Sequence, residues 1–215
     1  MENRSVPIST AVEVQSICVL GIALSYWISH VFFESTFVSD PVRTLGLFLI
    51  VEGPLLIALY SFLRDDPQKC SYWKAVGRGL LGLPLGALIN AFGAIVLGAP
   101  LGLMYWKKTI NWSLLMSLFT FVPATCVFGW SSKENWQRLV QYSKMTGRLD
   151  YMLSFPAYGA IVGGWFGAFP MPLDWERAWQ EWPICVTYGV IAGYFLGILI
   201  SLVLPVARKS SIKID

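Results

Sequence analysis

The side chains of this chain that could do chemistry together are concentrated in one short segment. Residues 166–183 read FGAFPMPLDWERAWQEWP and place Asp174, Glu176, Arg177 and Glu181 among three tryptophans. Carboxylates this close together could hold divalent metal ions, and such ions support phosphoryl transfer. A reaction of this kind would need further ligands elsewhere in the sequence.

Those further ligands are sparse. Glu34 and Asp40 are the other acids expected on the same side as this segment, and His30 is the only histidine. No acids stand at the spacing of metal ligands on a helix, and no HExxH, GxSxG or GxxxxGK motif occurs. The four cysteines are far apart and form no CxxC pair, which argues against a zinc site. We therefore expect no catalytic residues, no metal and no cofactor in this chain.

The composition indicates a membrane protein. Hydrophobic residues make up 55% of the 215 residues, charged residues only 13%, and the mean hydropathy is +0.58. Soluble domains carry about 25% charged residues. The basic residues are scattered, with no basic patch interleaved with aromatic residues, so we expect no nucleic-acid binding.

The apolar runs predict an all-α, polytopic membrane protein that forms one integral membrane domain over residues 1–215. A bilayer is crossed by roughly 20 apolar residues, and the backbone polar groups must be paired inside the lipid, which favours helices. The predicted bundle has about six transmembrane helices, at 11–33, 42–63, 75–103, 110–130, 152–169 and 183–206.

Lysine and arginine predict the orientation of this bundle. With six spans, the two termini and the second and fourth loops share one side, which holds twelve of these residues, against four on the other side. Because cytosolic loops are enriched in lysine and arginine, we expect both termini in the cytosol. The tryptophan-rich loop at 170–183 is then lumenal or exterior.

The tryptophans of this loop suggest an interfacial helix. If residues 175–182 are helical, Trp175, Trp179 and Trp182 fall at i, i+4 and i+7 on one face, with Asp174 as the cap. Tryptophan favours the membrane–water interface. Such a helix would lie flat on the membrane, either as a simple anchor or as a surface whose charged residues meet a partner.

Inside the membrane, Glu52 is the exceptional residue. It lies near the middle of the second predicted helix and is followed by Gly53 and Pro54. A carboxylate at this depth is costly and usually faces a bundle interior, a partner or a polar cavity. Two interpretations stay open. Glu52 could line a polar pocket, or it could hold two helices together by pairing with Asn90 of the third helix.

Glycine recurs every fourth residue on the last two predicted helices. This spacing makes a smooth face that lets another helix approach closely. The faces could pack within the bundle, although we expect at least one to meet another protein. The residues are Gly159, Gly163, Gly167, Gly189, Gly193 and Gly197.

The segment GAFPMPLDWERAWQEWPICVTYGVIAGYFLG closely resembles the C-terminal signature of the phosphatidylinositol-glycan class F (PIG-F) family of GPI-anchor biosynthesis. VLGAP, TFVPATCVFG and NWQRL resemble family segments in the same order, so the similarity covers about residues 92–204. One departure is Ala178, where many members have proline.

The resemblance implies a multi-pass protein of the endoplasmic reticulum membrane that is a non-catalytic accessory subunit. Its implied partner is a large GPI ethanolamine phosphate transferase of PIG-O type, and one of PIG-G type could be a partner as well. Zinc is expected in the partner enzyme. The loop residues Asp174, Trp175, Glu176, Arg177, Trp179 and Trp182 would contact the partner or the GPI precursor.

Two other functions stay open. The chain could itself be the transferase, using Asp174 and Glu176. Alternatively, it could handle membrane lipids, presenting the GPI precursor or phosphatidylethanolamine through a groove near Glu52 and Asn90.

Overall fold

The structure is a computed structural model that describes residues 6–130, 133–145 and 147–211. These residues form helices and connecting loops, with no strand among them, which confirms the all-α prediction. Two 3₁₀ turns lie at Tyr142–Lys144 and Ala178–Gln180. The α-helices are α1 (Ile8–Val31), α2 (Pro41–Phe62), α3 (Tyr72–Val96), α4 (Trp106–Thr120), α5 (Val122–Phe128), α6 (Lys133–Val140), α7 (Arg148–Ala168) and α8 (Ile184–Ser211).

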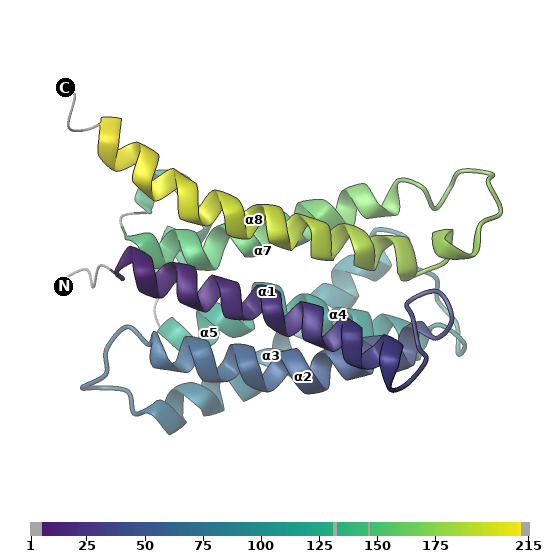
Figure 1. The fold of residues 1–215 in the computed structure, drawn as a ribbon, viewed down its shortest axis with the longest axis horizontal. Helices are drawn as coiled ribbons and strands as arrows, with labels where there is room; N and C mark the ends of the chain where they lie inside the picture. Colours follow the sequence, from purple (N-terminus) through teal and green to yellow (C-terminus); the bar gives the residue numbers. More distant parts are fainter. Residues whose placement is uncertain (1–5, 131–132, 146, 212–215) are drawn as a thin grey trace.

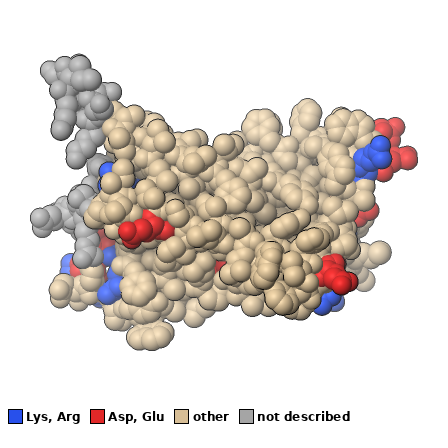
Figure 2. Space-filling view, in the orientation of Figure 1, with Lys and Arg blue, Asp and Glu red and all other residues tan. Residues whose placement is uncertain are grey.

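The long helices lie alongside one another in an up-and-down bundle (Figure 1). α1 begins and α8 ends at one end of the bundle, and the loop 169–183 that joins α7 to α8 lies at the opposite end. We call this segment the Trp-rich loop. In Figure 2, lysine, arginine, aspartate and glutamate gather toward the two ends and leave an uncharged belt between them. A belt of this kind suits the hydrocarbon core of a membrane.

Four helices are long and apolar enough to cross a membrane: α1, α2, α3 and residues Ile184–Ala207 of α8. α4 and α5 together make a fifth candidate span. α7 covers residues 152–168 of the predicted span 152–169, but it is not among these candidates by length and composition. The structure therefore confirms a polytopic membrane protein, while the count of six spans and the cytosolic termini stay predictions.

One predicted helix boundary was wrong, and one predicted helix is bent. α3 ends at Val96 rather than at residue 103, because Gly98 adopts a φ of +100° and leaves the right-handed helical region. The predicted helix 110–130 is bent by 42° between α4 and α5. Pro123 explains the bend, since it has no N–H to donate to Phe119 and its ring crowds that carbonyl.

The core lies where α1, α2, α4 and α8 meet. Phe48 and Leu56 of α2 and Leu115 of α4 are fully buried there. Phe119 stacks on Tyr194 of α8, with 4.1 Å between the ring centroids. α7 and α8 contact each other more extensively than any other pair of helices in the described chain. The last hairpin is therefore held together mainly by its own two helices.

Candidate functional site

Gln180 organises the Trp-rich loop. Its Nε2 donates to the carbonyl oxygens of Pro170 at 2.7 Å and Leu173 at 2.8 Å. Its Oε1 accepts from the backbone N–H of Arg177 at 2.9 Å. One buried amide thus ties the first half of the loop to the second, and each bond of this kind stabilises by about 0.5–1.5 kcal/mol.

Trp182 anchors the loop to the bundle. Its side chain is only 6% exposed, and its Nε1 donates to Oγ1 of Thr109 in α4 at 2.9 Å. Its ring lies 5.0 Å from the ring of Trp112, measured between centroids. This contact joins two segments more than 70 residues apart and fixes the loop against α4.

The predicted interfacial helix over residues 175–182 was wrong. Only Ala178–Gln180 form a 3₁₀ turn, and Glu176 has a φ of +50°, a left-handed conformation that a right-handed helix cannot contain. The three tryptophans therefore do not share one face. Trp182 points into the bundle, whereas Trp175 is 55% exposed and packs beside the exposed Trp179 at 5.9 Å between ring centroids.

The outer surface of the loop combines these two tryptophans with charged residues. Asp174, Glu176 and Arg177 are all exposed, and among the described residues none of the three takes part in an ion pair. Glu181 is different, because its carboxylate lies 3.6 Å from Nζ of Lys108. Within the described residues, no three His, Cys, Asp or Glu side chains lie close enough to hold a metal ion. The loop thus presents two tryptophans and an arginine, residue types that are enriched at interaction surfaces, beside two unpaired carboxylates.

Glu52 is fully buried between α1 and α2, and its carboxylate lies against Gly21 so closely that a Cβ there would overlap Oε2. Neither carboxylate oxygen has a hydrogen-bond partner in the described chain. The suggested pair with Asn90 is wrong. Asn90 faces α4 instead, where its Nδ2 lies 3.4 Å from Oγ1 of Thr120 and 2.9 Å from the carbonyl oxygen of Gly86.

Replacing Glu52 by methionine is expected to raise the free energy of unfolding by about 1–3 kcal/mol. The reason is that methionine has a similar length and leaves no unpaired polar group in the core. Glu52→Gln, the control that keeps a polar group, should unfold like the wild type. Thermal unfolding of the purified protein in mild detergent measures both. A methionine variant less stable than the glutamine variant would show that this carboxyl has a structural partner.

The two glycine rows face each other across the α7–α8 contact. A Cβ at Gly159 would overlap the carbonyl oxygen of Gly193, and one at Gly163 would overlap that of Gly189. A Cβ at Gly167 would lie 2.7 Å from the carbonyl oxygen of Cys185, and one at Gly197 would overlap the carbonyl oxygen of Phe155 in α7. The contact within the chain thus uses both rows, and four of the six glycines stay partly accessible at its side. That one of these faces meets another protein stays a prediction.

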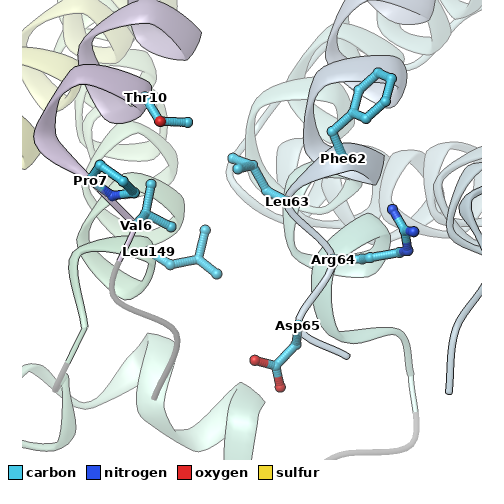
Figure 3. A pocket seen from close by; sticks show the side chains of 8 residues that line it. All are labelled: Val6, Pro7, Thr10, Phe62, Leu63, Arg64, Asp65 and Leu149. Atoms are coloured by element: carbon cyan, nitrogen blue, oxygen red, sulfur yellow. The ribbon is translucent and has the colours of Figure 1, made fainter. Parts of the chain in front are cut away.

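A cavity of about 250 Å³ lies at the other end of the bundle, where α1 begins, α2 ends and α7 begins. Figure 3 shows Leu63 and Leu149 facing one another across it, while the side chain of Arg64 extends away. The Arg64 guanidinium donates to the carbonyl oxygens of Cys70 at 2.7 Å and Ser61 at 3.2 Å. Because this cation is engaged by the backbone, the cavity is poorly suited to an anionic ligand.

Sequence reasoning missed the residues that hold the loop in place. Gln180 and Thr109 carry no motif that distinguishes them from ordinary polar residues. The proximity of Gln180 to the charged residues could have suggested a role. The partnership of Thr109 with Trp182 could not be read from the sequence, because it depends on how α4 packs beneath the loop.

The fold and the loop together define a class: a helical, multi-pass membrane protein with a fixed aromatic and charged loop at one end of its bundle. The chain belongs to the GPI biosynthesis protein family Pig-F, whose family model matches residues 17–202.

Related proteins carry names from the same process. The chain is 31% identical over 192 residues to the human protein named GPI ethanolamine phosphate transferase, stabilizing subunit, covering 86% of each chain. The mouse protein of that name is 38% identical over 192 residues, again with 86% of each chain covered. Glycosylphosphatidylinositol anchor biosynthesis protein 11 of Debaryomyces hansenii is 36% identical over 164 residues, which cover 71% of this chain and 67% of the relative. No solved structure matches the chain.

Proposed function

We propose that this protein is a non-catalytic subunit of the endoplasmic reticulum membrane that binds and stabilises a GPI ethanolamine phosphate transferase. The names of the human and mouse relatives support this role. The observation that carries it is the Trp-rich loop, whose exposed Trp175, Trp179, Asp174 and Arg177 are held in one conformation by buried contacts. A surface fixed before binding loses less conformational entropy when a partner docks.

The partner we propose is a large transferase of PIG-O type, with a PIG-G type as the second candidate. Zinc and the reacting groups belong to that enzyme, and the present chain contributes no catalytic residue or cofactor. The lipid substrate, the GPI precursor, would approach near the same loop.

Replacing Asp174 and Arg177 together by alanine is expected to lower recovery of the transferase about tenfold, which corresponds to roughly 1.4 kcal/mol of binding free energy. The expected cause is the loss of two polar contacts at the rim of the interface. The measurement is affinity purification of the tagged protein in mild detergent, with mass spectrometry and a transferase assay on the eluate. Thermal unfolding should not change, because both side chains are exposed.

A matched control is the double variant Asp66→Ala and Lys69→Ala, which removes an exposed ion pair of 3.1 Å from the loop 63–71. Its recovery of the transferase should equal that of the wild type, because the loops 63–71 and 169–183 lie at opposite ends of the bundle (Figure 1). Unchanged recovery and unchanged activity in the Asp174 and Arg177 variant would contradict docking through the loop. A protein that elutes alone yet transfers ethanolamine phosphate would contradict the accessory role itself.

A further inference from the structure

A groove of about 590 Å³ runs along the outer side of the α7–α8 contact. Its floor consists of the two glycine rows, and its walls are the side chains of Val162 and Phe166 from α7 and of Leu196 and Ile200 from α8. These four side chains are exposed, so the groove opens onto the surroundings of the bundle. The close approach that glycine permits therefore forms a recess bordered by larger side chains.

The groove is apolar throughout. Among the residues that line it, Tyr158 has the only polar side chain, and its hydroxyl already donates to the carbonyl oxygen of Leu139 at 2.7 Å. A ligand with hydrogen-bonding groups would lose its contacts with water here and gain none in return. The occupant within the groove must therefore be hydrocarbon.

The length of the groove matches one acyl chain. From Phe155 to Gly167 the lining covers twelve helical steps, or about 18 Å at 1.5 Å per residue. The hydrocarbon core of a bilayer is about 30 Å thick, so one leaflet is roughly 15 Å. The groove starts near the end of α7 that leads into the Trp-rich loop and extends slightly more than one leaflet.

The charges of the Trp-rich loop suggest which headgroup this lipid has. The loop joins the two helices that form the groove, so it follows the end of the groove that Gly167 and Gly189 line. Its exposed Glu181 is paired with Lys108. The loop also exposes one cation, Arg177, and two more carboxylates, Asp174 and Glu176, with no ion pair to these three among the described residues. A guanidinium suits a phosphate, and carboxylates suit an ammonium group. This arrangement complements a zwitterionic headgroup better than an anionic one.

We propose that the α7–α8 groove binds an acyl chain of a zwitterionic phospholipid from the leaflet on the loop side, with the lipid headgroup at the level of the Trp-rich loop. The binding is a property of this chain and does not depend on the transferase. It would place a phospholipid carrying a phosphate and an ammonium group next to the surface that we propose for docking the transferase.

The test uses the full chain, reconstituted into vesicles of equal parts phosphatidylcholine, phosphatidylethanolamine and phosphatidylglycerol. The protein is extracted again in mild detergent and washed, and the retained phospholipid is quantified by mass spectrometry. We expect zwitterionic phospholipid to be retained in preference to phosphatidylglycerol. Filling the groove by Val162→Trp or Leu196→Trp should lower this retention about tenfold.

The chain offers a matched control for each variant. Ile161 is 50% exposed beside Val162 at 51%, and Leu199 is 59% exposed near Leu196 at 60%, yet neither control residue lines the groove. Ile161→Trp and Leu199→Trp should therefore retain lipid like the wild type. Two groove positions on different helices keep the test valid if one variant fails to fold.

Three results would overturn the proposal. The first is retention of no phospholipid by the wild type, and the second is equal retention by groove and control variants. The third is that the protein retains as much phosphatidylglycerol as it retains of each zwitterionic lipid. If groove variants keep the lipid but lose the transferase in affinity purification, a transferase helix occupies the groove, which also contradicts an acyl chain there. Loss of lipid with normal transferase recovery would support the groove proposal and leave the proposed function intact.

Discussion

Replacing Gly193 by alanine is expected to lower the free energy of unfolding by about 1–3 kcal/mol, the usual cost of overpacking a tight contact. The added Cβ would overlap the carbonyl oxygen of Gly159 and lie 2.8 Å from Cα of Gly163. Both obstacles are backbone atoms, so no side chain can rotate to relieve the clash. α7 and α8 would have to separate, and their mutual contact is the largest in the described bundle.

Gly93→Ala is the matched control for this variant. Gly93 lies inside α3, and a Cβ built there meets no atom within 4 Å. Because alanine favours a helix over glycine by about 1 kcal/mol, this control should be as stable as the wild type or slightly more stable. Thermal unfolding in mild detergent, followed by circular dichroism, compares the two variants. Equal stability of Gly193→Ala and Gly93→Ala would contradict the close contact between α7 and α8.

Replacing Trp182 by alanine is expected to lower the free energy of unfolding by about 3–5 kcal/mol. The variant would lose the packing against Trp112 and the hydrogen bond to Thr109. Trp182→Phe keeps a ring but loses the hydrogen bond, so its loss should be only about 1 kcal/mol. Thermal unfolding measures stability, and affinity purification measures recovery of the transferase.

Trp175→Ala separates stability from binding. Trp175 is exposed and contacts the ring of Trp179, so its removal should leave unfolding unchanged while it lowers recovery of the transferase. Trp182→Ala should lower both, because the loop would no longer be held against α4. If Trp182→Ala left stability unchanged, the burial of this side chain in the bundle would be wrong. If Trp175→Ala left recovery unchanged, the transferase would dock elsewhere.

The sequence by itself determined the class of the protein. Long apolar runs in a membrane can pair their backbone groups only by forming helices, so α1, α2, α3 and α8 follow from composition and length. The segment around Asp174 and Trp175 was enough to suggest the family, which the match over residues 17–202 shows. Glycine at every fourth residue predicted close helix contacts, because residues four apart lie on the same face of a helix whatever the helix packs against.

Only the tertiary structure decided how these parts meet. The two glycine rows face each other, and Glu52 faces Gly21 rather than Asn90. Both contacts depend on how each helix is rotated about its axis within the bundle. The direction of each tryptophan side chain in the loop could not be predicted from the sequence either. Outside a helix, residue spacing no longer fixes side-chain direction, and the loop takes its shape from hydrogen bonds to distant residues. The bond from Trp182 to Thr109 turns one tryptophan inward and leaves Trp175 and Trp179 exposed, because it joins segments that only folding brings together.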